Sequence, residues 1–212
     1  MDIETLIMHA PFKLSDEDIR VLRGQSERLE PHTWDEVKGM IVRTGRWHAE
    51  IGKTHGSVLE YVRHERLHWP KHIIARDAVP FAHADDWKII WNDWPYDLAD
   101  GMMHLVIWSK SRTAVDPETG LPTDHTAKLI ESFLDRTFGE TLGCRRGQDL
   151  LWFKQKTAWQ SVKALEHIHV LLRNVPEERV EKLVGQRRSQ TLRALVGESM
   201  ASIETRISSK MS

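Results

Sequence analysis

The sequence predicts an α+β fold in which helices surround an antiparallel β-sheet. Apolar residues recur at spacings of three and four in the first third of the 212-residue chain, which is typical of amphipathic helices. Short apolar runs bounded by turn residues lie between residues 86 and 172, and such runs indicate strands. Helical spacing returns after Pro176. We expect one domain over residues 1–212, made of a helical part (1–84), a sheet core with one helix (85–175) and a helical tail (176–212).

Three helices are expected before the sheet. Ser15 and Thr33 each stand three residues before an acidic residue, and this spacing is typical of a capped helix start. Helices are therefore expected over about 15–29 and 34–51. A third is expected over about 57–67, where apolar side chains again recur at helical spacing.

The core is expected to hold four strands and one helix. Thr123 stands where a cap would begin the helix, which runs to about Phe138 with its apolar residues on one face. The strands are expected at residues 86–92, 104–109, 149–154 and 165–172.

The tail carries an apolar stripe. Between Leu192 and Ile207, apolar side chains recur at three and four, as on one face of a helix. We expect this stripe to pack on the domain, because no heptad pattern is long enough for a coiled coil. A homodimer through the tail is the alternative.

Composition narrows the classes of protein. The chain has 30 basic and 31 acidic residues and a net charge of −1, so it lacks the basic excess of a nucleic-acid-binding domain. No stretch approaches the roughly 20 apolar residues of a membrane helix, and the N-terminus does not look like a signal peptide. Cys144 is the single cysteine, which excludes an internal disulfide framework. We expect a soluble cytoplasmic protein that binds neither nucleic acid nor membrane.

Two histidines interrupt the last expected strand, LEHIHVLLRN at 165–174. Alternate residues of a strand share a face, so His167 and His169 point the same way. In the strand at 104–109, His104 shares a face with Val106 and Trp108. If the two strands belong to one sheet, three histidines converge on one side of it.

Two chemistries suit such a face. A histidine can attack phosphorus and form a covalent intermediate while polar neighbours hold the phosphate. Alternatively, His167 and His169 form half of a divalent-metal site, with His104 as the third ligand and one position left open. A hydrogen-bonded histidine pair in a half-buried sheet, without catalytic function, is the third interpretation.

Two further stretches hold candidate substrate-binding residues. In DWKIIWNDWPY, polar groups end a strand and aromatic rings follow that can stack on a ligand. The stretch before the histidines carries side chains of the kinds that bind phosphate or carboxylate. The candidates are Asn92, Asp93, Trp94, Tyr96, Lys154, Gln160 and Ser161. The alternatives are a turn stabilised by Asx hydrogen bonds and solvated lysines.

His64-Glu65-Arg66-Leu67-His68 matches the H-E-x-x-H pattern of zinc proteases. No third ligand is evident in the sequence, and Pro70 leaves little helix to support a site. We interpret these residues as histidines on the surface of a helix.

Six stretches of the chain occur in the order PHTWDEVK, GSVLEYVRHERLHW, DWKIIWNDWPY, HLVIWSK, LWFKQ and EHIHVLLR. Together they resemble the N-acetylglucosamine-induced protein family, a domain family of undefined function. The resemblance covers about residues 31–180. It implies an intracellular enzyme or accessory protein, with specialised metabolism as one setting, and does not specify a reaction.

The order of Asn92-Asp93, Tyr96, His104, Gln160-Ser161 and His167-Ile168-His169 is also similar to the layout of the histidine-triad superfamily. That resemblance implies an α+β fold with an antiparallel sheet and a histidine that attacks the α-phosphate of a nucleotide without a metal. It implies that His167 or His169 is the nucleophile, Asn92 and Asp93 lie near the nucleotide, Gln160 and Ser161 contact phosphate, and His104 lines the pocket. Leu165 and Leu171 stand where a third alternating histidine is expected.

These observations lead to three functional hypotheses. The first is a hydrolase or transferase that acts on a phosphorylated or nucleotide-like small molecule through His167, His169 and His104. The second is a metal-dependent enzyme that uses the same histidines as ligands. The third is a non-catalytic binding module whose interface is the apolar stripe of the tail.

Overall fold

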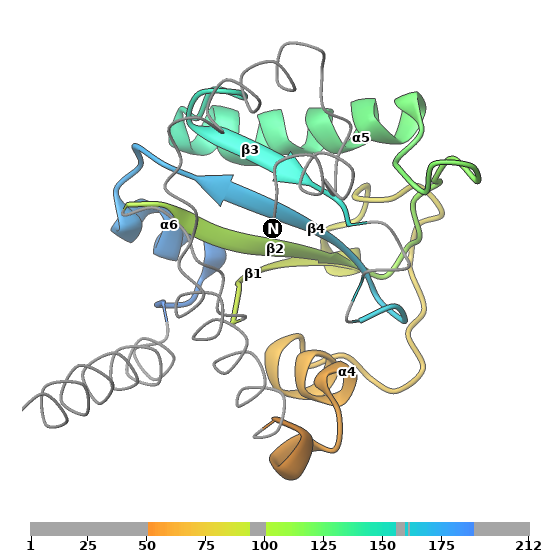
Figure 1. Ribbon diagram of the computed structural model, residues 1–212. Helices are drawn as coiled ribbons and strands as arrows, with labels where there is room; N and C mark the ends of the chain where they lie inside the picture. The colour runs from red at the N-terminus through yellow and green to blue at the C-terminus, as the bar shows by residue number, and fades with distance from the viewer. Residues whose placement is uncertain (1–50, 94–100, 156–159, 161, 189–212) are drawn as a thin grey trace, which may run out of the picture.

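The computed structural model describes residues 51–93, 101–155, 160 and 162–188. A four-stranded sheet with strand order β1-β2-β4-β3 lies at its centre (Figure 1), and every neighbouring pair of strands is antiparallel. The strands are β1 (Trp87–Trp91), β2 (Met103–Ser109), β3 (Leu150–Phe153) and β4 (Glu166–Leu172). The expected α+β class and antiparallel sheet are confirmed, and each strand ends within one residue of its expected bounds.

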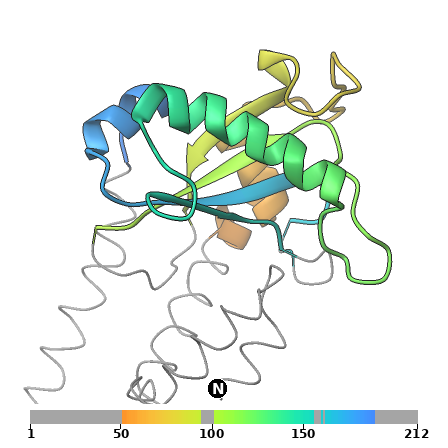
Figure 2. The ribbon, with the colours of Figure 1, turned by 90° about the horizontal axis from the view of Figure 1, so that it is seen from above.

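One face of the sheet is covered by helices that follow β2 and β4. These are α5 (Asp124–Leu134), its π-helical continuation η3 (Asp135–Glu140) and α6 (Glu177–Val184). Ile107 of β2, Ile168 of β4, Phe133 of α5 and Phe138 of η3 are all buried in the core that fills this layer. Figure 2 shows α5 crossing this face of the sheet, with α4 on the opposite side.

The expected helix at 123–138 is confirmed, including its cap. The Thr123 side chain accepts the backbone N–H of Thr126 at 3.2 Å, which satisfies one of the free amides at a helix start. The helix changes to π winding at Asp135, a change that the apolar spacing does not reveal.

The opposite face packs against the segment before the sheet. Here α4 (Val58–Glu60) runs directly into a second π-helix, η1 (Tyr61–Arg66), so the helix expected over 57–67 is present with different winding. Val62 of η1 and Val106 and Trp108 of β2 are buried in one cluster on this side. The apolar side chains of β2 therefore contact two separate cores, one on each face.

α6 lies at the start of the expected helical tail, of which the structure describes residues 176–188. It ends at Gly185, whose φ of 71° is the left-handed conformation that glycine adopts readily at a helix end. The helices expected at 15–29 and over most of 34–51, and the apolar stripe from Leu192, lie outside the described residues.

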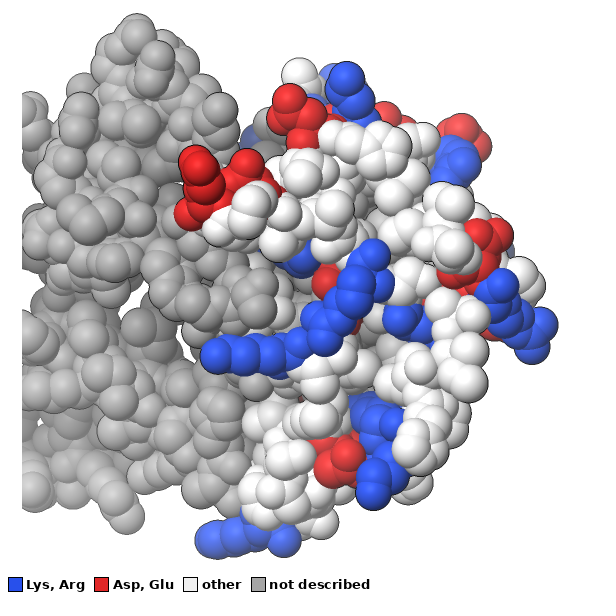
Figure 3. Space-filling model, turned by 90° about the vertical axis from the view of Figure 1, so that its right-hand side faces the viewer, with Lys and Arg blue, Asp and Glu red and all other residues white. Residues whose placement is uncertain are grey.

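The described surface carries charges of both signs. On the face shown in Figure 3, basic and acidic side chains lie among uncharged ones. Of the helices that the structure describes, none has the length and apolar character needed to cross a membrane.

Two leucine variants test the position of the core. Leu105 is 0% exposed and Leu151 is 52% exposed. We expect Leu105→Ala to lower the free energy of unfolding by about 2–5 kcal/mol, because it leaves a cavity. Leu151→Ala is expected to change it by about 0.5 kcal/mol or less. Urea denaturation measures both values, and equal losses would contradict the assignment of the core.

Candidate functional site

The pairing of β2 with β4 brings the three histidines together. In this register Trp108 lies opposite His167, and Val106 lies opposite His169. His104 lies opposite Leu171, two residues from His169, and such diagonal neighbours are within reach of aromatic side chains. The convergence expected from strand alternation is therefore present, in one sheet and on one face.

His104 and His169 form a buried pair. The Nε2 atom of His104 lies 2.9 Å from Nδ1 of His169, so one imidazole donates a hydrogen bond to the other. The Phe153 ring, opposite His169 on β3, stacks on His169 with 4.7 Å between centroids and 6° between planes. His104 is 4% exposed and His169 is 6% exposed, so both rings are almost fully buried.

His167 has a different environment. Its ring stacks on Trp108 with 4.6 Å between centroids, and its Nδ1 atom lies 3.0 Å from the backbone carbonyl oxygen of Leu165. A carbonyl can only accept a hydrogen bond, so Nδ1 carries the hydrogen of the neutral imidazole. The Nε2 atom of His167 then holds the lone pair.

Burial keeps the three imidazoles neutral. Desolvation lowers the pKa of His104 from 6.5 to about 4. It also lowers the pKa of His167, against the opposing effects of the Leu165 carbonyl and the Glu166 carboxylate. The pKa of His169 lies well below its usual value, first because of burial and then because His104 and His167 are close. At neutral pH all three side chains are bases without charge.

The metal interpretation is not supported by this geometry. Among the residues described, no group of three or more His, Cys, Asp or Glu side chains is arranged to hold a metal ion. His104 and His169 direct nitrogen atoms at each other across 2.9 Å, whereas ligands of one zinc ion point to a common centre about 2.0–2.1 Å from each nitrogen.

Asn92 and Asp93 lie at the end of β1, next to the start of β2. The Asn92 backbone N–H donates to the His104 carbonyl at 2.9 Å, so Asn92 is a neighbour of the histidine face. Asp93 accepts a hydrogen bond from Tyr61 Oη at 2.8 Å and pairs with Arg66 Nε at 2.5 Å. Burial raises the pKa of Asp93, and the charge of Arg66 opposes this effect. These contacts connect the end of β1 to η1. The two partners on η1, Tyr61 and Arg66, are not among the candidates predicted from the sequence.

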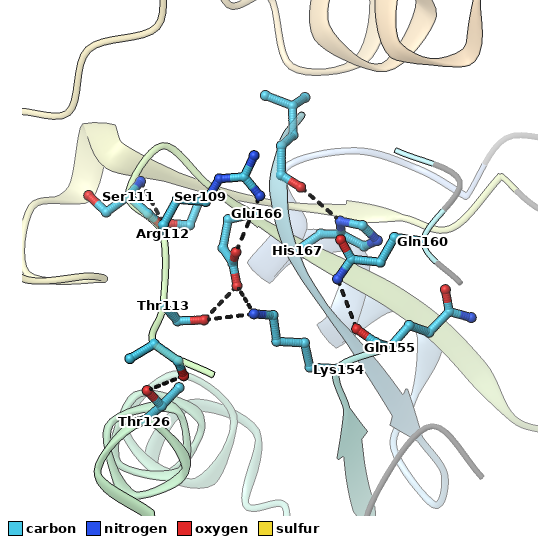
Figure 4. A network of polar contacts seen from close by, with 12 residues as sticks. Ser109, Ser111, Arg112, Thr113, Thr126, Lys154, Gln155, Gln160, Glu166 and His167 are labelled. Carbon is cyan, nitrogen blue, oxygen red and sulfur yellow. Dashed lines mark hydrogen bonds and ion pairs between the residues drawn. The ribbon is translucent and has the colours of Figure 1, made fainter. Parts of the chain in front are cut away.

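Lys154, expected as a substrate contact, lies in a buried ion pair. Its Nζ atom lies 2.8 Å from Glu166 Oε1, and the two side chains are only 4% and 3% exposed. Thr113 Oγ1 donates to the same carboxylate oxygen at 2.6 Å. The ammonium group is therefore held inside the protein by an acidic residue of β4 (Figure 4).

Of the remaining candidates, the structure describes Gln160. Gln160 is 6% exposed and donates from its amide to the Gln155 carbonyl at 2.9 Å. Trp94, Tyr96 and Ser161 lie outside the described residues.

The H-E-x-x-H stretch forms local contacts. His64 Nδ1 lies 2.8 Å from Glu65 Oε1, and His68 Nδ1 lies 2.9 Å from the His64 carbonyl. His68 has a positive φ of 54°, so the helix has ended before the second histidine. These contacts agree with surface histidines and not with a zinc-protease helix.

The burial of His104 predicts a loss of stability in acid. Its pKa falls from 6.5 to about 4 on folding, so the unfolded chain binds more protons between these values and stability decreases as pH falls through this range. We expect His104→Gln to reduce this pH dependence by up to about 1.4 kcal/mol per pH unit. Urea unfolding across the range measures it, with exposed His125→Gln as the control. A slope unchanged by His104→Gln would contradict the assignment.

The buried ion pair predicts an asymmetric mutational effect. Lys154→Met leaves the Glu166 carboxylate buried without its closest cation, and we expect a loss of about 3–5 kcal/mol. The double variant Lys154→Met/Glu166→Gln removes both charges and is expected to recover most of that loss. Urea unfolding of wild type and both variants measures the effect. A double variant no more stable than the single one would show that unpaired charge is not the cause.

Comparison with known proteins places the chain in a family. Residues 32–173 match the family described as "Protein of unknown function (DUF3605)". N-acetylglucosamine-induced protein 1 of Candida albicans is 31% identical over 147 residues, which are 61% of this chain and 57% of that protein. The match therefore spans little more than half the length of that relative.

Two further comparisons are more distant. Uncharacterized protein YPL067C of Saccharomyces cerevisiae is 23% identical over 177 residues, or 72% of this chain and 84% of that protein. The structure titled "Crystal Structure of HTC1" is similar with a TM-score of 0.50 and 22% identity, covering 80% of this chain and 95% of that one. This structural similarity concerns the fold alone.

These comparisons confirm the resemblance to N-acetylglucosamine-induced proteins, while the histidine-triad resemblance stays a prediction. Because the family match at residues 32–173 covers more than half of the 212 residues, the chain belongs to the DUF3605 family.

Proposed function

We propose that this protein is a hydrolase or transferase that acts on a phosphorylated or nucleotide-like small molecule, with His167 as the nucleophile. The observation that carries the proposal is the 3.0 Å contact between His167 Nδ1 and the Leu165 carbonyl. It supports a neutral imidazole whose Nε2 lone pair is fixed in direction. Such a nitrogen needs no base to activate it.

The geometry favours His167 over His169 in this role. His169 Nδ1 already takes part in the 2.9 Å contact with His104, and Phe153 stacks on its ring. His104 and His169 then act as neutral, buried neighbours that form one wall of the site.

The chemistry follows from this assignment. The Nε2 lone pair forms a bond to phosphorus, and the bond from phosphorus to the leaving-group oxygen breaks with its electron pair on that oxygen. Water, or an acceptor alcohol, then attacks phosphorus and the P–N bond breaks, which returns the pair to Nε2. Overall, the leaving group takes one proton of the water and phosphorus takes the hydroxyl.

Trp108 supplies a donor beside the nucleophile. Its Nε1 atom is buried, and no acceptor among the described residues forms a hydrogen bond with it. Buried donors are normally paired, so a phosphate oxygen of a bound substrate would satisfy this one. The next candidate contacts to the substrate are the amide of Gln160 and the side chain of Asn92, which lies beside His104 at the far end of the histidine face. His167 is 4% exposed, so a substrate must displace the groups that cover the ring.

The histidine-triad resemblance is part of this proposal, and the antiparallel sheet supports it. An antiparallel strand carries the proposed nucleophile. The carbonyl that accepts the hydrogen bond from His167 belongs to Leu165, which stands where a first alternating histidine would. The resemblance supports nucleotide-like substrates. The name of the Candida albicans relative, N-acetylglucosamine-induced protein 1, adds phosphorylated N-acetylglucosamine to the compounds worth testing.

A turnover screen tests the proposal. Nucleoside phosphates, nucleoside phosphoramidates and phosphorylated N-acetylglucosamine are incubated with the protein, and phosphorus NMR follows their conversion. We expect one class to be converted, with the rate reduced at least about a hundredfold in His167→Asn, as for loss of a nucleophile. His125→Asn, which changes an exposed histidine, is expected to keep the wild-type rate.

Chelator is included in a parallel series. We expect turnover to persist in its presence, because in the proposed step His167 Nε2 attacks phosphorus without the help of a metal ion. Turnover that chelator abolishes would favour the metal-dependent alternative. Binding of a compound without any conversion would favour a non-catalytic module, and either result would overturn the proposal.

A further inference from the structure

A buried network lies on the side of β4 away from the histidines. Lys154 Nζ is 2.8 Å from Glu166 Oε1 and donates to Thr113 Oγ1 at 3.1 Å. Thr113 donates in turn to Glu166 at 2.6 Å. Figure 4 shows these groups meeting from three segments, namely the loop after β2, the end of β3 and the start of β4. Burying such charges is expensive unless geometry and hydrogen bonds compensate.

Arg112 connects this network to the chain that enters β4. Its Nη2 donates to the Lys163 carbonyl at 2.7 Å and to the Ala164 carbonyl at 2.9 Å. Its Nη1 lies 3.8 Å from Glu166 Oε2. The planar guanidinium thus holds two successive carbonyls and lies near the carboxylate of a third residue, which a lysine ammonium cannot do with the same geometry.

The residue enclosed by these contacts is Leu165. Its carbonyl accepts from His167 Nδ1 at 3.0 Å, while the network holds Lys163 and Ala164 before it and Glu166 after it. Peptide units are planar, so fixing the units on both sides restricts the direction in which the Leu165 carbonyl points. That carbonyl decides which nitrogen of His167 carries the hydrogen.

We propose that Arg112 is a positioning residue for His167. It acts through the backbone at 163–165, supported by the Lys154–Glu166 pair, and it holds the Leu165 carbonyl where it keeps the hydrogen on Nδ1 and the lone pair on Nε2. The use of this lone pair in catalysis rests on the proposed function. The effect of Arg112 on the tautomer of His167 is independent of the proposed function.

Nitrogen NMR of labelled protein tests the inference, because the two nitrogens of a neutral imidazole give separate signals for each tautomer. In wild type we expect His167 as the Nδ1–H form. In Arg112→Ala we expect the ratio of the Nε2–H to the Nδ1–H form to rise about fivefold, as for loss of one hydrogen bond. His167 is assigned by its absence from the spectrum of His167→Asn.

Arg179→Ala is the matched control. Arg179 also donates to a backbone carbonyl from the surface, to Thr141 at 2.9 Å, but away from the histidine face. We expect this variant to leave the tautomer of His167 unchanged at a similar small loss of stability. Should Arg112→Ala fail to fold, Arg112→Lys keeps the charge without the planar fork and is expected to show part of the same shift.

A His167 tautomer that is the same in wild type, Arg112→Ala and Arg112→Lys would overturn the inference. A shift of equal size in Arg179→Ala would also overturn it, because the effect would then be general. The screen for turnover decides the proposed function separately. A tautomer shift in a protein without turnover would support the positioning role of Arg112 and reject the catalytic role of His167. Turnover without a tautomer shift would support the catalytic role of His167 and reject the positioning role of Arg112.

Discussion

The antiparallel pairing of β2 with β4 determines both the apolar core and the histidine face. Both strands lie in the middle of the sheet, and one set of their side chains fills the core beneath α5. The register that buries those apolar residues also sets Trp108 opposite His167 and brings His104 to His169. A shift of one residue would exchange the faces. The core and the histidine face are therefore specified by the same pairing.

The second consequence is electrostatic. The histidines occupy a face where burial lowers the pKa of each one, so they are neutral and suited to act as bases or nucleophiles. A buried ion pair lies on the other side of β4, where Lys154 and Glu166 neutralise each other. The neutral histidine face and the Lys154–Glu166 pair are thus separated by the thickness of one strand.

Much of this arrangement is predictable from sequence, because strand alternation is a local rule. Apolar runs place the four strands within one residue, and alternation assigns His167 and His169 to one face. The role of Lys154 is not predictable in this way, because its partners Thr113 and Glu166 come from distant segments that only the fold brings together. The tautomer of His167 likewise depends on the direction of one backbone carbonyl, and no side-chain pattern encodes it.

The most direct measurement of the central claim is covalent labelling with adenosine monophosphate activated as its imidazolide, followed by an alkaline quench and peptide mass spectrometry. We expect the buried His167 to be labelled in preference to the exposed His125, because its neutral Nε2 is fixed in direction. The label at this site disappears in His167→Asn. Labelling that follows solvent exposure, with His125 modified and His167 unmodified, would contradict the claim that this face holds a nucleophile.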